Sequence, residues 1–452
     1  MVRERSNDWR DRSSKWLKRL ASGLSGGRQH EIANLYLQIR ERNPRFPEKQ
    51  YEAALPGSFG AKRAVVRLSV PKMPKGRIYT FSEHASTDDG EPNDLVVACT
   101  VGGFAVSDDL GLSWEEIRLR SFARFPIVRS RILPNREILL LAMDPDDHKP
   151  WADQFNRFIV ADMRGTILHT AKIPGPIWHG PRSVDVSGDT LMYSEYPGDD
   201  ARSGRDATAP RTSRVWRSRD FARSWQVVFE QENIRHFHFL QARPGSAGEW
   251  WLTSGDEPSE SRIWKSSDDG DTWVDRTDTF GPTVRIGAFG FPRSLFRLTD
   301  LVWAGDEMIW GSDDVLGSAK EYTSSSVWKR AAGSRVFRAD LSAGATPIVL
   351  GRCGPEVRNI VDIGKFYVLI TQSSPRFADN KPQVFLLAKR TGEREAGVAH
   401  LFDVDRFTRG PTGFTYSLAS RRASNGVFFT FRKPKDVFRA QNRILKWQFE
   451  FE

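Results

Sequence analysis

The sequence predicts an all-β fold in which seven similar four-stranded sheets form a closed ring, a seven-bladed β-propeller. One turn motif occurs three times with the same internal spacing. Related turns recur along the chain at intervals close to the roughly 40 to 50 residues that one propeller blade occupies. The composition agrees, because 15 Trp, 29 Phe and 36 Gly among 452 residues suit many short strands joined by tight turns. Rings of six or eight blades are compatible with the same rhythm.

The repeated motif has the order S-x-D-x-G-x-x-W. It occurs at residues 107–114 (SDDLGLSW), 218–225 (SRDFARSW) and 266–273 (SSDDGDTW), and Ala222 replaces the Gly in the second copy. The Asp carboxylate can accept hydrogen bonds from turn N–H groups, the Gly can adopt a positive φ, and the Trp can pack over the turn. Each copy follows an apolar or aromatic run, so each is predicted to connect two strands.

This motif resembles the Asp-box, the bacterial neuraminidase repeat of sialidase-like β-propellers of the bacterial glycosyl hydrolase type. Sialidases, other glycoside hydrolases, sortilin-type receptors and assembly factors all carry such boxes, so the resemblance implies the fold and a carbohydrate-linked role without fixing a reaction. It also implies that the functional face lies opposite the boxes. The Arg-Ile-Pro element of catalytic sialidases has only an imperfect counterpart in Arg131-Ile132-Leu133-Pro134, so a true sialidase is not favoured.

Two regions are expected along the chain. Residues 1–55 are predicted to form a short helical extension, since apolar residues such as Trp16, Leu20 and Leu24 recur at near-helical spacing. Residues 56–452 are predicted to form the propeller, closed by pairing AVVRLSV (64–70) with the C-terminal strands, which leaves few exposed edges. One blade each is assigned to turns at Gly111, Gly165, Ala222, Gly270, Gly344 and Gly392, and a seventh to the final strand RILKWQFEF.

Charge and composition limit the partners. There are 67 Lys and Arg against 57 Asp and Glu, and the net charge of +10 favours an anionic partner. The two cysteines show no metal-ligand spacing, so we expect no zinc, no disulfide framework and no cofactor. No nucleic-acid-binding motif and no apolar run long enough for a transmembrane segment is present. The N-terminus lacks the apolar core of a secretory signal, which predicts a cytoplasmic protein, and a monomer is favoured over an oligomer.

The candidate site combines the starts of innermost strands with the ends of second strands. Basic and imidazole groups occur at the starts of the predicted innermost strands, and acids, a Tyr and a Gln at the ends of the second strands. Arg binds carboxylates through two parallel hydrogen bonds, and acids accept hydrogen bonds from sugar hydroxyls, so this ring predicts an acidic, uronate-containing oligo- or polysaccharide. Alternatively, the same residues pair with one another as salt bridges. The substrate-binding candidates are Arg129, Arg131, Arg182, Arg297, Arg358, Asp256 and Asp313, beside Asp144 and Gln372.

The catalytic candidates are His236, His238, Tyr196 and Glu195. Alternate residues of a strand share one face, so the two imidazoles should lie together while Phe237 enters the core. In a lyase, a His would remove the uronate C5 proton and Tyr196 or the other His would protonate the leaving oxygen. In a glycoside hydrolase, Glu195 and Asp256 would flank the bond. The alternative function is a non-catalytic glycan- or protein-binding propeller, and a lone HxH pair does not predict a metal site.

Overall fold

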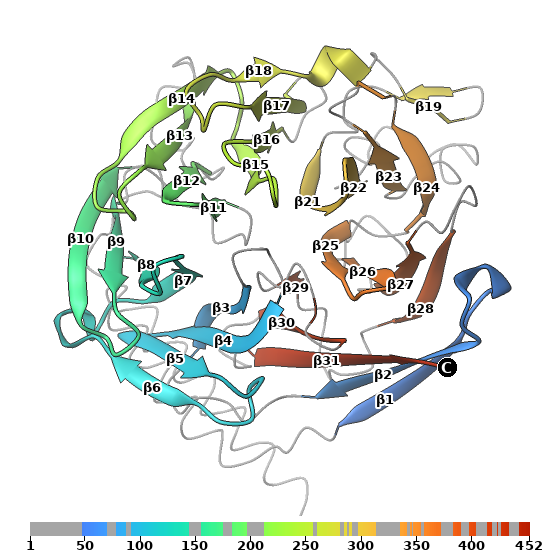
Figure 1. The fold of residues 1–452 in the computed structure, drawn as a ribbon, viewed down its shortest axis with the longest axis horizontal. Helices are drawn as coiled ribbons and strands as arrows, with labels where there is room; N and C mark the ends of the chain where they lie inside the picture. Colours follow the sequence, from blue (N-terminus) through green and yellow to red (C-terminus); the bar gives the residue numbers. More distant parts are fainter. Residues whose placement is uncertain are drawn as a thin grey trace, which may run out of the picture.

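The computed structural model shows an antiparallel β-sheet ring (Figure 1). The described parts of the chain are 48–69, 78–86, 92–143, 155–174, 183–196, 212–255, 260–280, 284–286, 289–291, 297–312, 335–340, 344–345, 347–353, 357–371, 383–389, 397–403, 414–417, 423, 426–433 and 443–452.

The described strands form seven blades around a central axis, which confirms the predicted fold and blade number (Figure 1). In the first three blades, each innermost strand is followed outward by the next strands in sequence. Blade 1 contains β3 (Ile78–Ser86), β4 (Pro92–Thr100), β5 (Gly103–Ser107) and β6 (Glu115–Arg118); blade 2 contains β7 (Ile127–Ile132), β8 (Ile138–Met143), β9 (Phe155–Ala161) and β10 (Ile167–Pro174); blade 3 contains β11 (Val184–Ser187), β12 (Thr190–Ser194), β13 (Thr212–Ser218) and β14 (Gln226–Glu232).

The next three blades repeat this order, and a small hairpin and short 3₁₀ turns lie outside the blades. Blade 4 contains β15 (Phe237–Ala242), β16 (Trp250–Ser254), β17 (Arg262–Ser266) and β18 (Val274–Asp275); blade 5 contains β21 (Leu298–Ala304), β22 (Glu307–Ser312), β23 (Arg335–Ala339) and β24 (Ile348–Arg352); blade 6 contains β25 (Val357–Asp362), β26 (Phe366–Thr371), β27 (Gln383–Ala388) and β28 (Val398–Asp403). The hairpin is β19 (Val284–Ile286) and β20 (Phe289–Phe291), and the 3₁₀ turns include Gly57–Phe59, Arg120–Phe122 and Thr277–Phe280.

Blade 7 closes the ring by joining the two ends of the described chain (Figure 1). It contains β29 (Phe414–Ser417), β30 (Val427–Lys433), β31 (Arg443–Phe451), β2 (Arg63–Ser69) and β1 (Lys49–Ala54). The predicted closure is confirmed, since β2 pairs with β31 from Ala64↔Phe451 to Ser69↔Lys446.

The N-terminal boundary differs from the prediction. Strand β1 lies within residues 1–55, which the sequence assigned to a helical extension, but it pairs with β2 along its whole length. Its alternate residues Tyr51 and Ala53 pack on the core of the closing blade, as the two-residue period of a strand requires. The propeller therefore includes Lys49–Ala54. The segments on which the helical prediction rests fall within residues 1–47, which lie outside the described residues.

The core lies between neighbouring blades. Every residue of β12, β15, β16 and β26 is buried, because inner strands have a neighbouring blade on each side. Fully buried Trp250, Trp251, Trp310 and Trp447 fill the larger spaces. In the parts of the chain that are described, no helix is long and apolar enough to span a membrane.

The three predicted box turns (residues 107–114, 218–225 and 266–273) each contain the same pattern of hydrogen bonds. In the third, Gly270 N donates to Ser266 Oγ at 2.8 Å, and Asp268 Oδ1 accepts from Thr272 N at 2.9 Å. Gly270 and Ala222 have φ of 85° and 67°, the left-handed region that the motif predicts. The hydroxyl before each Trp, in Ser113, Ser224 or Thr272, also donates to the Asp, a motif position that the sequence pattern left unassigned.

Candidate functional site

The segments that the sequence predicts as innermost strands overlap β7, β11, β15, β21, β25 and β29, and those predicted as second strands overlap β8, β12, β16, β22 and β26. The structure has these strands in the predicted positions, and β3 is a further innermost strand that was not predicted. The start of each innermost strand pairs with the end of the second strand, as in Phe237↔Ser254 and Val357↔Thr371. The third strand starts beside them and runs to the opposite face, where the box turns lie. The starts of innermost strands and the ends of second strands therefore lie on one face of the ring, hereafter the upper face. The opposite face, which carries the box turns, is hereafter the box face.

Three of the four catalytic candidates meet on the upper face, between blades 3 and 4. The rings of Tyr196 and His236 stack with centroids 3.6 Å apart at 20°. His236 Nε2 lies 3.1 Å from His238 Nε2, so one of these two nitrogens carries a hydrogen and donates a hydrogen bond to the other. The two histidines are only 3% and 8% exposed. Phe237 points the other way, into the core beside Trp264, as predicted.

The fourth catalytic candidate, Glu195, points away from this cluster. Its carboxylate is buried in blade 3, where it accepts hydrogen bonds from Trp216 Nε1 at 2.9 Å and Arg214 N at 3.3 Å. Burial raises the pKa of Glu195, and the Trp216 hydrogen bond only partly offsets that effect. Consecutive residues of an extended chain point in opposite directions, which is why Glu195 and Tyr196 separate.

Two of the proposed substrate-binding arginines link neighbouring blades. Buried Arg129 donates to Ser183 Oγ at 2.9 Å and to the Val184 carbonyl oxygen at 3.1 Å. Arg131 forms an ion pair with Asp185, a residue only 1% exposed. Arg131 therefore forms an internal salt bridge, although with an acid outside the candidate set, whereas the hydrogen bonds of Arg129 are to uncharged groups.

The acid Asp185 was not among the candidates. It lies on innermost strand β11, and Asp300 occupies a related place on β21, where its Oδ2 accepts from Ile360 N of the next blade at 2.8 Å. An Asp inside an otherwise apolar innermost strand, as in VDV and TDL, is a sequence signal for such links between blades, because a buried carboxylate requires hydrogen-bond donors.

Two of the remaining candidates are described, and both lie at the starts of innermost strands. Arg297 immediately precedes β21 and Arg358 is the second residue of β25, and both are half-buried. Arg182, Asp256 and Asp313 lie outside the described residues, as do Asp144 and Gln372. Among the residues that the structure does describe, no three His, Cys, Asp or Glu side chains are grouped to hold a metal ion.

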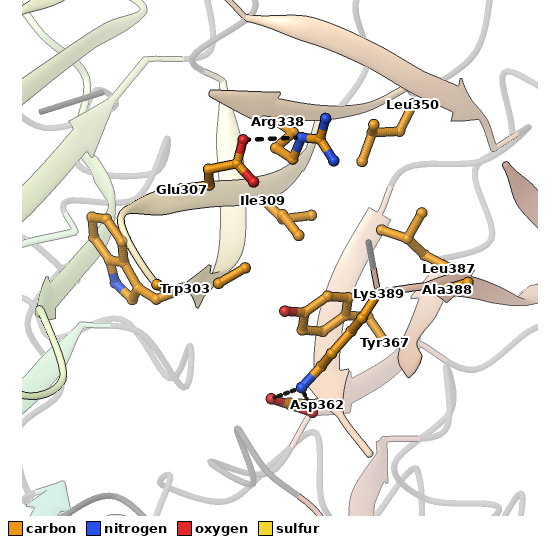
Figure 2. Close-up of a pocket in the computed structure, with 12 residues that line it drawn as sticks. Trp303, Glu307, Ile309, Arg338, Leu350, Asp362, Tyr367, Leu387, Ala388 and Lys389 are labelled. Atoms are coloured by element: carbon orange, nitrogen blue, oxygen red, sulfur yellow. Dashed lines mark hydrogen bonds and ion pairs between the residues drawn. The ribbon is translucent and has the colours of Figure 1, made fainter. Parts of the chain in front are cut away.

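A pocket that the sequence did not predict lies between blades 5 and 6. Its volume is about 380 Å³, and Figure 2 shows charged, aromatic and aliphatic side chains around it. The lining comes from the ends of β21, β23, β25 and β27 and the starts of β22, β24 and β26, so the pocket opens on the box face. The main side chains are Trp303, Glu307, Ile309, Arg338, Leu350, Asp362, Tyr367, Leu387 and Lys389.

Two ion pairs line this pocket, and they differ in length and in hydrogen-bond geometry (Figure 2). Lys389 Nζ lies 2.6 and 2.7 Å from the two carboxylate oxygens of Asp362, and 4.9 Å from the Tyr367 ring centre. Among the described residues, the one acid that Arg338 approaches is Glu307, whose Oε1 lies 3.3 Å from Nε without hydrogen-bond geometry. Lys389 is therefore fully engaged, whereas the guanidinium of Arg338 is not.

No protein-family model and no curated protein matches the sequence. Solved structures with a similar fold include YCF48 bound to D1 peptide, at 12% identity and a TM-score of 0.44 over 84% of this chain and 99% of that one. YCF48 from Cyanidioschyzon merolae has 8% identity and a TM-score of 0.46 over 84% and 98% of the two chains. The Pan2 WD40 domain of Neurospora crassa has 10% identity and a TM-score of 0.41 over 89% and 97%. At these values the similarity assigns neither a family nor a function.

Proposed function

We propose that this chain is a non-catalytic recognition propeller, which binds a partner through the pocket between blades 5 and 6. The observation that carries the proposal is that several side chains predicted to bind or convert a substrate are buried and bonded inside the protein. Arg129 and Arg131 link neighbouring blades, and the Glu195 carboxylate is hydrogen-bonded inside blade 3, so these three largely buried groups are engaged within the protein. The open pocket, in contrast, offers charged and aromatic side chains on another face.

A recognition role needs a complementary surface and no proton-transfer pair. The pocket supplies such a surface, since apolar Ile309, Leu350 and Leu387 lie beside ionised side chains, and protein pockets that bind ligands combine these two features. The excess of basic residues adds a long-range attraction for an anionic partner, which raises the rate of encounter.

A second candidate function is retained for the upper face, a lyase or hydrolase acting on an acidic glycan. The stacked Tyr196, His236 and His238 favour it, because two imidazoles and a phenol in contact can exchange protons with a ligand. The buried state of both imidazoles weighs against it, since a general base must reach the proton that it removes.

An activity screen separates the two functions. The purified chain is incubated with uronate-containing and sialylated oligosaccharides, while ultraviolet absorbance reports the unsaturated uronate of a lyase and reducing-sugar assays report hydrolysis. The recognition proposal expects neither signal. A signal abolished by His236→Ala, and preserved in His400→Ala on the outer strand β28, would instead establish the enzyme.

A further inference from the structure

We infer that the pocket between blades 5 and 6 binds a carboxylate joined to an apolar or aromatic group, with Arg338 as the residue that holds the carboxylate. The inference rests on the proposed recognition function and names the chemistry of its ligand. Three features of the pocket carry it: the unused hydrogen-bonding capacity of Arg338, the apolar walls, and the arrangement of the other charges.

Arg338 is only 7% exposed, yet among the described residues its guanidinium approaches one acid alone, Glu307, at 3.3 Å through Nε. Within the part of the chain that the structure describes, the buried Nε has no hydrogen-bond partner. A guanidinium has five N–H donors in a fork that matches a carboxylate, so burial without acceptors is unfavourable. In Figure 2 the two terminal nitrogens lie on the side away from Glu307. A ligand carboxylate would satisfy the donors that Glu307 leaves unused.

The walls favour an apolar body on that carboxylate. In Figure 2, Ile309 lies between the rings of Trp303 and Tyr367, Leu350 lies beside Arg338, and Leu387 lies on the side of Tyr367 away from Trp303. Trp303 also carries a buried Nε1 without a hydrogen-bond partner among the described residues, a second donor at the pocket. The volume of about 380 Å³ is at the small end of the 300 to 1,000 Å³ typical of ligand pockets, so it suits one or two peptide residues or a small acid.

The remaining charges favour a single negative charge. Lys389 is held by both oxygens of Asp362, so it does not attract a second anion. Glu307 is 32% exposed and faces Arg338, and it would repel a dianion such as phosphate more strongly than a monocarboxylate. A C-terminal peptide carboxylate and a free carboxylic acid share the required chemistry.

The test measures binding of four probes to the full chain by calorimetry: N-acetyl-leucine, its uncharged amide, and an octapeptide ending in Leu with a free or an amidated C-terminus. We expect the free acids to bind at least tenfold more tightly than the amides. Arg338→Gln should reduce binding of the acids about tenfold, because a charge-assisted pair of hydrogen bonds is lost. Arg214→Gln, on the corresponding strand of blade 3, should leave it unchanged. A tighter fit of the free-ended peptide than of N-acetyl-leucine identifies a peptide source, and equal affinity identifies a small acid.

A second variant protects the test against misfolding of Arg338→Gln. Glu307→Gln removes the anion that lies 3.3 Å from Arg338, so it should tighten binding of the acids severalfold while thermal melting stays unchanged. Equal binding of acids and amides, an unchanged affinity in Arg338→Gln, or no binding of any probe would each overturn the carboxylate inference. The proposed function fails separately, if the chain turns over a glycan in the activity screen.

Discussion

Arg131, on the innermost strand of blade 2, forms an ion pair with Asp185, on the innermost strand of blade 3. The second carboxylate oxygen of Asp185 accepts a hydrogen bond from Ala242 N, on the innermost strand of blade 4, at 3.0 Å. One buried acid therefore joins three consecutive blades near the axis of the ring. This use of Arg131 removes it from the group of residues available to a ligand.

Asp185→Ala should strongly destabilise the ring. It leaves the Arg131 guanidinium without its buried anion and the Ala242 N–H without an acceptor, and breaking a buried pair in this way typically costs about 3 to 5 kcal/mol. Denaturant unfolding measures the change. Glu452→Ala is the control, because Arg63 and Glu452 are 44% and 57% exposed and solvent screens such a pair, so little stability should be lost. Similar losses in both variants would contradict the assigned role of Asp185.

Glu195→Gln should change how stability depends on pH. The pKa of Glu195 is raised in the folded protein by burial, so the folded state holds this proton more tightly than the unfolded state. The contribution of Glu195 to stability is thus greatest at low pH and declines as pH rises from the ordinary Glu pKa through the raised one. The Gln variant keeps an oxygen for Trp216 Nε1 and should lose this decline.

Thermal melting of both proteins across the acid range is the measurement. The wild-type chain should lose stability relative to Glu195→Gln as pH rises. Parallel pH profiles would show that the carboxylate is not held in the environment described above.

Gly311→Ala should destabilise the contact between blades 5 and 6. A Cβ added at Gly311 would lie 2.2 Å from Cβ of Val357, a fully buried residue on the next innermost strand. Overpacking of this kind costs about 1 to 3 kcal/mol. Gly397→Ala, where an added Cβ meets no atom within 4 Å, should not lower the melting temperature. A harmless Gly311→Ala would mean that the two blades separate more easily than their packing indicates.

Trp447→Ala should weaken the closure of the ring. Trp447 is fully buried on β31, the strand that pairs with β2, and it stacks on Phe428 with centroids 5.8 Å apart. Removing a buried aromatic side chain costs about 3 to 5 kcal/mol. Unfolding in denaturant should show this loss, and Val274→Ala at a 53% exposed position should be close to neutral.

The strand order around the ring was largely predictable. The spacing of turns located the innermost and second strands because each blade repeats the same local pattern, and edge pairing required the ends of the chain to meet at AVVRLSV. Strand β1 was missed because its short alternating pattern in KQYEAA lies in a region assigned to helices on other residues. The convergence of His236 with His238 also followed from sequence, since alternate strand residues share a face.

The assignment of roles to single side chains was less predictable. The sequence placed Arg131 and Glu195 at the upper face but could not show that Asp185 and Trp216 engage them, because those partners belong to other strands. The pocket at Arg338 was not anticipated at all, since its walls come from two blades and from residues between Trp303 and Lys389.

The sequence by itself determined the box turns, the strands and the closed ring, because these depend on contacts within a few residues or on a repeating pattern. The tertiary structure decided which charged groups are internally satisfied and which face a pocket. The physical reason is that a buried charged group finds an ion-pair or hydrogen-bond partner only if a group on another strand lies within a few ångströms of it. Arg131 meets the buried acid Asp185, whereas among the described residues the acid beside Arg338 is the half-buried Glu307.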